Sequence, residues 1–125
     1  MKRILFYLLL ITALTAGCRG SSTYTDLDVD EFAQMLLDRQ DGVLLLDVRT
    51  PEEFAEGHIP GALNVNWFDE DFMEQLEPVL RKDIPVLIYC RGGNRSARAA
   101  ALIQSSGYPA YNLLGGYQAW TASGR

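Results

Sequence analysis

The sequence has 125 residues, of which 48% are hydrophobic and 22% are charged, and its net charge at pH 7 is −5. This length suits one compact domain with a single hydrophobic core. The excess of 16 acidic over 11 basic side chains argues against nucleic acid as a partner. Two cysteines and one histidine are too few for a disulfide framework or a Cys/His metal cluster, so we expect neither a metal nor another cofactor.

The first 17 residues have the pattern of a secretory signal peptide. Lys2 and Arg3 precede an apolar run over 4–14, which is too short to span a membrane comfortably. Small residues then lead to Cys18, and this arrangement resembles a bacterial lipoprotein cleavage site, at which Cys18 becomes the lipidated N-terminus. The alternative is ordinary cleavage after Ala16, without a lipid.

Removal of residues 1–17 leaves nine basic and 16 acidic side chains, a net charge of −7. Membrane attachment would then depend on the lipid rather than on charge. The polar stretch over 19–25 reads as a tether, so we divide the chain into a signal peptide (1–17), a lipid-anchored tether (18–25) and a domain (26–125). Retention in the inner membrane is associated with an aspartate directly after the lipidated cysteine. Because Arg19 occupies this position, we expect the protein on the periplasmic side of the outer membrane.

The domain alternates between helical and strand patterns. Acidic caps at Asp28 begin a helix over 28–37, and Thr50, Pro51 and Glu53 have the N-cap, first-turn and capping-box positions of a second helix. Further helices are predicted over 72–80, from Ser96 to the stop signal at Gly107, and over 116–122. Apolar runs predict strands over 43–48, 62–67, 86–89 and 110–114.

This alternation predicts an α/β fold, an open parallel sheet of about five strands with helices on both faces. In such sheets, ligands bind at the carboxyl ends of the strands. Cys90 follows one predicted strand, and Asp47 and Arg49 lie at the end of another. We therefore expect the three residues to share one rim, where Asp47 and Arg49 form a salt bridge that supports the site rather than a direct substrate contact.

The stretch from Pro85 to Gly107 places Cys90 between a buried strand and a helix start, with two glycines between them. Backbone N–H groups and the helix dipole should meet at the sulfur, and Arg91 and Arg95 add positive charge. Free thiols titrate near pH ~8.5, whereas cysteines in such surroundings have pKa values of ~3.5–7.5. The alternative is an inert, buried structural cysteine.

Three motifs in this order resemble the rhodanese (thiosulfate sulfurtransferase) family over residues 24–125. They are Asp47-Val48-Arg49 with Pro51-Glu52-Glu53-Phe54 and Gly57-His58-Ile59-Pro60-Gly61-Ala62, the loop from Cys90 to Arg95, and Leu114-Gly115-Gly116 with Ala119-Trp120. The resemblance implies a single rhodanese-like domain with sulfurtransferase activity. It also implies that His58 belongs to the fold signature and is not the general base of Cys90.

The expected chemistry is a two-step sulfur transfer through a Cys90 persulfide. A small anionic donor such as thiosulfate supplies the sulfur, and cyanide, a thiol or a reductant of the cell envelope accepts it. We expect the loop to bind the donor and the transferred sulfur. Its backbone N–H groups stabilise the persulfide, and its arginines dock the donor, whereas Arg98 is less able to reach it. The binding residues are Arg91, Gly92, Gly93, Asn94, Arg95 and Ser96.

Two other functions remain open. Phosphatases and arsenate reductases also use a cysteine in an anion-binding loop, but their signature has five residues between cysteine and arginine, whereas Cys90 and Arg95 are separated by four. Some relatives of the rhodanese fold lack the cysteine and serve as docking or sensor modules. The intact loop around Cys90 argues against a non-catalytic role.

Overall fold

The structure, a computed structural model, describes residues 23–39 and 42–125. Within these residues, five parallel strands form one sheet in the order β1-β5-β4-β2-β3. The strands are β1 (Thr25–Leu27), β2 (Leu44–Asp47), β3 (Leu63–Asn64), β4 (Val86–Tyr89) and β5 (Ala110–Leu113). The helices are α1 (Val29–Asp38), α2 (Pro51–Ala55), α3 (Phe72–Leu76), α4 (Asn94–Ser105) and α5 (Gly116–Ala122). The predicted α/β fold with an open parallel sheet is confirmed.

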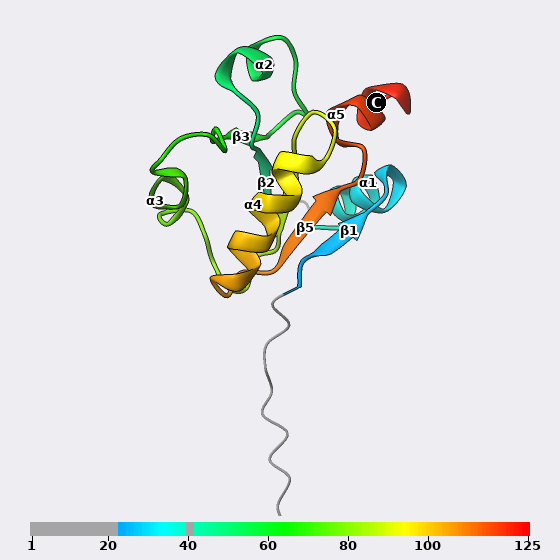
Figure 1. The fold of residues 1–125 in the computed structure, drawn as a ribbon. Helices are drawn as coiled ribbons and strands as arrows, with labels where there is room; N and C mark the ends of the chain where they lie inside the picture. Colours follow the sequence, from blue (N-terminus) through cyan, green and yellow to red (C-terminus); the bar gives the residue numbers. More distant parts are fainter. Residues whose placement is uncertain (1–22, 40–41) are drawn as a thin grey trace, which may run out of the picture.

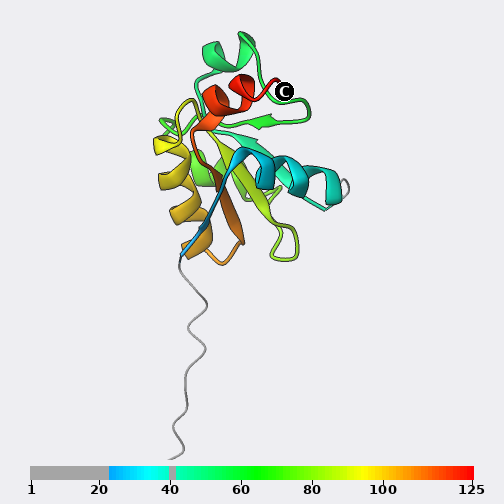
Figure 2. The ribbon, with the colours of Figure 1, turned by 90° about the vertical axis from the view of Figure 1, so that its right-hand side faces the viewer.

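Helices cover both faces of the sheet, and α4 and α1 lie on opposite sides of it (Figures 1 and 2). Side chains of the central strand β4 alternate between the two sides, because successive residues of a strand point to opposite faces. On one side Ile88 packs in a cluster with Leu76 and Ile103, and on the other side Leu87 packs in a cluster with Phe32. All four residues of β4 are buried, as its continuous apolar run predicts.

The predicted cap at Asp28 and the predicted capping box at Thr50 are both present, and the cap at Asp28 is also a capping box. The Asp28 side chain accepts the backbone N–H of Glu31 at the start of α1, and Glu31 reaches back to the N-cap. At α2, Thr50 and Glu53 make the same reciprocal pair, and Pro51 occupies the first turn. These caps satisfy backbone N–H groups that a helix start leaves free, so the local sequence determines where both helices begin.

Several boundaries differ from the prediction. Helix α3 ends at Leu76 instead of residue 80, because Pro78 has no N–H to continue the helix. Helix α4 begins at Asn94, two residues before the predicted start. Regular pairing of β3 with β2 covers two residues rather than 62–67, although Val65 still donates a hydrogen bond to the carbonyl of Asp47. Strand β1, which pairs with β5, was not predicted.

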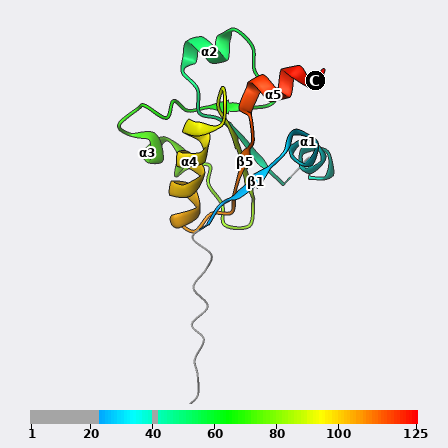
Figure 3. The ribbon, with the colours of Figure 1, turned by 45° about the vertical axis from the view of Figure 1, so that its right-hand side comes forward.

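The carboxyl ends of the strands form one edge of the sheet, and α2 and α5 lie at that edge (Figure 3). The predicted signal peptide, Cys18 and the tether as far as residue 22 lie outside the described residues. In the part of the chain that the structure describes, no helix is long and apolar enough to cross a membrane.

Candidate active site

Cys90 directly follows β4, the strand in the middle of the sheet, and only 2% of the residue is exposed. The chain turns through residues 91–93 and enters α4 at Asn94. Gly93 has φ of +110°, a left-handed conformation that residues with a Cβ rarely adopt. The sulfur therefore lies beneath a tight loop, between a strand end and a helix start.

Hydrogen-bond donors of the loop and of α4 surround the Cys90 Sγ. The backbone N–H of Gly93 donates over 3.0 Å, and the hydroxyl of the buried Ser96 donates over 3.2 Å. Burial by itself would raise the pKa of the Cys90 thiol. The Ser96 hydroxyl and the backbone N–H groups of Ser96, Gly93 and Gly92 outweigh burial, so the pKa is lowered. This loop thus favours the thiolate, the form in which cysteine acts as a nucleophile.

Helix α5 holds the loop from its other side. The backbone N–H of Tyr117 donates to the carbonyl of Cys90 over 2.8 Å, and that of Gln118 donates to the carbonyl of Arg91 over 3.1 Å. In a trans peptide the C=O and the next N–H point in opposite directions. Because the Arg91 carbonyl points to α5, the N–H of Gly92 turns away from α5 and toward the sulfur.

Gly116 makes this close approach possible. A Cβ at this position would lie 2.5 Å from the carbonyl oxygens of both Cys90 and Arg91, and its φ is +59°. No residue with a side chain fits there without moving the loop backbone. The first residue of α5 therefore belongs to the active-site scaffold, although it is distant from Cys90 in sequence.

Arg95 forms a bidentate ion pair with Glu53 of α2, with N–O distances of 2.7 and 2.9 Å. The Arg95 guanidinium lowers the pKa of Glu53 to about 2, and the same pairing raises the pKa of Arg95. The sequence predicts that Arg95 docks an anionic donor. In the structure its guanidinium is bound to a carboxylate, so it joins α2 to the start of α4, and donor docking by Arg95 stays a prediction.

Asp47 and Arg49 form an ion pair that is buried, where the sequence predicts a salt bridge on the rim. Nitrogens of Arg49 donate to both carboxylate oxygens of Asp47 over 2.8–3.1 Å. Burial alone would lower the pKa of Arg49, but Asp47 outweighs this effect and the pKa is raised. Arg49 also donates to the Gly57 carbonyl over 2.7 Å and lies 4.4 Å from the centroid of the Tyr117 ring. The pair thus links the end of β2 to the segment after α2 and to α5.

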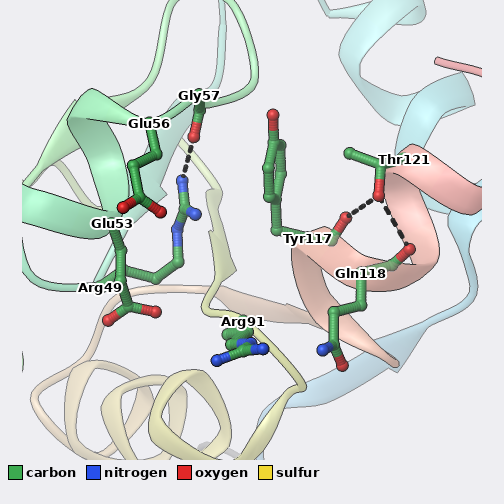
Figure 4. Close-up of a pocket in the computed structure, with 8 residues that line it drawn as sticks. All are labelled: Arg49, Glu53, Glu56, Gly57, Arg91, Tyr117, Gln118 and Thr121. Atoms are coloured by element: carbon green, nitrogen blue, oxygen red, sulfur yellow. Dashed lines mark hydrogen bonds between the residues drawn. The ribbon is translucent and has the colours of Figure 1, made fainter.

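A cavity of about 310 Å³ opens between α2 and α5, next to the loop (Figure 4). Its lining residues are Arg49, Glu53, Glu56, Gly57, Arg91, Tyr117, Gln118 and Thr121. Arg91 was predicted as a binding residue, whereas Glu56 and the three residues of α5 were not. The spacing of Gln118 and Thr121, three residues apart on a short helix, was the available signal, because such residues share a helix face.

The remaining candidate residues lie around this centre. Asn94 is exposed at the first turn of α4, and Arg98 is exposed further along the helix. The ring of His58 stacks on Phe54, with 3.7 Å between centroids, and its Nδ1 lies 3.0 Å from the Phe54 carbonyl oxygen. These contacts agree with a role for His58 in the fold. Among the described residues, no group of His, Cys, Asp and Glu side chains could hold a metal ion.

Comparisons with known proteins agree with this geometry. A family model described as a rhodanese-like domain matches residues 28–123. A sulfurtransferase of Allochromatium vinosum is 40% identical over 104 residues, covering 79% of this chain and 90% of that protein. The thiosulfate sulfurtransferase GlpE of Pseudomonas putida is 35% identical over 89 residues, covering 70% and 77%. The crystal structure of a rhodanese-like domain protein from Staphylococcus aureus matches with a TM-score of 0.66 and 32% identity, over 77% of this chain and 90% of that one.

Proposed function

Because the chain belongs to the rhodanese-like domain family, we propose that it is a sulfurtransferase in which Cys90 carries the sulfur as a persulfide. Relatives named as sulfurtransferases support this class of reaction. The observation that carries the role of Cys90 is the set of donors around its sulfur, the N–H of Gly93 and the hydroxyl of Ser96. A sulfur that accepts several hydrogen bonds in a buried loop is suited to bear negative charge.

The first step takes sulfur from an anionic donor, for which thiosulfate is the proposed example. The Cys90 thiolate attacks the outer sulfur of thiosulfate, the S–S bond of thiosulfate breaks, and its electron pair leaves with sulfite. The product is a Cys90 persulfide with one negative charge on its terminal sulfur. The inward N–H groups of the loop stabilise this charge as an oxyanion hole stabilises an oxyanion.

Arg91 is the arginine best placed to dock the donor. It lies beside Cys90 in sequence and lines the cavity, and its side chain is exposed. Arg95 is held by Glu53, and Arg98 lies on the exposed face of α4. We therefore assign the main share of donor attraction to Arg91 and to the loop N–H groups, and a supporting role to Arg95.

The ion pair between Arg95 and Glu53 argues against phosphatase or arsenate reductase chemistry. Such a mechanism needs a free guanidinium to bind the oxyanion, and it needs a loop one residue longer. The loop has four residues between Cys90 and Arg95, and Arg95 already forms two bonds to Glu53. Both features favour transfer of a single sulfur atom over hydrolysis of a tetrahedral ester.

We further propose that the protein is exported and carries a lipid at Cys18, on the periplasmic side of the outer membrane. The support is the sequence pattern of residues 1–18. In that compartment a thiol acceptor or a reductant would return Cys90 to the thiolate, since an unpaired thiol is otherwise prone to oxidation.

Mass spectrometry of the intact protein tests the central proposal. Thiosulfate should add the mass of one sulfur atom, and cyanide should remove it. Cys90→Ser should abolish the adduct, whereas Cys18→Ser, the matched control, should keep it. An adduct that survives in Cys90→Ser would show that the nucleophile is misassigned. Aryl phosphatase turnover that Cys90→Ser abolishes would favour the phosphatase alternative.

A further inference from the structure

The charged side chains around the cavity differ in whether they already have partners. Glu53 is bound to Arg95, and Arg49 is bound to Asp47, so each of these charges is neutralised. Arg91 and Glu56 also line the cavity, both are exposed, and neither forms an ion pair with another described residue. The cavity therefore presents one free positive charge and one free negative charge.

These two charges lie on different parts of the cavity. Figure 4 shows Glu56 on the α2 side, Gln118 on the α5 side, and Arg91 between these two sides. The Gln118 Oε1 lies 3.9 Å from the position that a Cβ would take on Gly92, so this side chain borders the loop that encloses the sulfur. A ligand in the cavity would thus lie against the loop that encloses the Cys90 sulfur.

We infer that this cavity is the acceptor subsite and that it takes a small thiol carrying both a carboxylate and an ammonium group. Arg91 binds the carboxylate and Glu56 binds the ammonium. The volume of about 310 Å³ is at the lower end of the range for small-molecule pockets, ~300–1,000 Å³, which suits a ligand of amino-acid size. This inference rests on the proposed persulfide function and names the acceptor class for it.

The transfer step needs no further reactant. The acceptor thiol loses its proton to solvent, and the resulting thiolate attacks the terminal sulfur of the Cys90 persulfide. A new S–S bond forms on the acceptor while the S–S bond to Cys90 breaks, and the electron pair returns to the Cys90 sulfur. The products are the acceptor persulfide and the Cys90 thiolate.

A single-turnover experiment on the full-length protein tests the assignment. The protein is first loaded with thiosulfate and freed of excess donor, so that donor docking does not affect the measured rate. Cysteine, cysteamine, N-acetylcysteine or cyanide is then added, and loss of the sulfur adduct is followed by mass spectrometry. Cysteamine lacks the carboxylate, N-acetylcysteine lacks the free ammonium, and cyanide lacks both.

Each variant should slow only the acceptors that carry the matching group. Glu56→Gln should slow cysteine and cysteamine, and Arg91→Gln should slow cysteine and N-acetylcysteine. The expected loss is roughly three- to ten-fold in the second-order rate constant, between an exposed ion pair and a charge-assisted hydrogen bond. Glu52→Gln and Arg98→Gln, matched exposed residues that do not line the cavity, should change no acceptor. Comparing each thiol with itself across variants cancels differences in intrinsic thiol reactivity.

Three outcomes separate the two proposals. Wild-type protein that cannot be loaded by thiosulfate would contradict the persulfide function itself. The acceptor assignment would be overturned if the protein loads normally but Glu56→Gln transfers sulfur at the wild-type rate to every acceptor, or is slowed equally with all four. The persulfide function would still stand in that case. If thiosulfate cannot load the Arg91→Gln protein, the transfer rates of Glu56→Gln alone decide the acceptor assignment.

Discussion

Replacing Gly116 by alanine should loosen the active-site loop without touching any side chain of the site. The new Cβ would lie 2.5 Å from the carbonyl oxygens of Cys90 and Arg91 and 2.6 Å from the carbonyl carbon of Arg91. Real Cβ atoms do not approach backbone this closely, so α5 and the loop must separate. The hydrogen bonds from Tyr117 and Gln118 to those carbonyls would then lengthen.

Two costs add in this variant. A left-handed alanine costs about 1–2 kcal/mol, and overpacking against backbone costs about 1–3 kcal/mol more, so the free energy of unfolding should fall by roughly 2–5 kcal/mol. Displacing the loop also turns the N–H of Gly92 from the sulfur. Loss of one hydrogen bond to a charged group, about 1.5 kcal/mol, should lower the alkylation rate of Cys90 at neutral pH by roughly ten-fold.

Gly61→Ala is the matched control. Its φ is +86°, also left-handed, but a Cβ there would have nothing within 4 Å. It should lose only about 1–2 kcal/mol and keep the wild-type rate of Cys90 alkylation. Urea unfolding and iodoacetamide alkylation across a pH series measure both quantities. A folded Gly116→Ala protein with the wild-type pH profile of alkylation would refute the argument that α5 sets the direction of the loop N–H groups.

Three further predictions concern single interactions. Ser96→Ala should lower Cys90 alkylation at neutral pH by about ten-fold, because one hydroxyl donor to the thiolate is lost, and an unchanged rate would remove Ser96 from the site. Glu53→Gln should reduce the unfolding free energy by roughly 1–3 kcal/mol near pH 7. Because the pKa of Glu53 is lowered to about 2 from an ordinary 4.5, this difference should persist above about pH 4.5 and shrink as the pH falls toward 2, and urea unfolding that shows no such convergence would contradict the ion pair with Arg95. Cys18→Ser should move the protein from the membrane fraction to the soluble envelope fraction, and a wild-type protein already soluble after cell breakage would contradict lipidation.

The parts of the fold that local chemistry determines could be predicted from the sequence. Asp28 and Thr50 cap helices by hydrogen bonds that span three residues, so the pattern alone identifies them. The position of Cys90 follows from a buried strand, glycines and a helix start in direct succession. Strand β1 could not be predicted in the same way, because its three residues gain order from pairing with β5, 86 residues away in the chain.

The parts of the site that depend on distant contacts were harder to predict. Glu53 was predicted to complete a capping box and does so, but it also binds Arg95, 42 residues later. The role of Gly116 depends on backbone of Cys90 and Arg91, which no local pattern indicates. Arg95 was thus predicted as an open anion-binding residue, since its sequence neighbours give no sign of a carboxylate partner.

The parallel sheet gives the domain two unlike ends. The chain enters at Thr25, at the amino edge, while Cys90, α2 and α5 lie at the carboxyl edge (Figures 1 and 3). A strand of four residues spans about 13 Å, so at least this height separates the point of entry from the loop. A surface that holds the protein by its N-terminus would therefore leave the loop facing the medium, open to diffusing reactants. The last residue, Arg125, lies beside α1 rather than at the cavity, because its guanidinium lies over Trp120 and pairs with Asp30 of α1. Immobilisation through the N-terminus would thus keep the Cys90 loop at the end of the domain that faces away from the support.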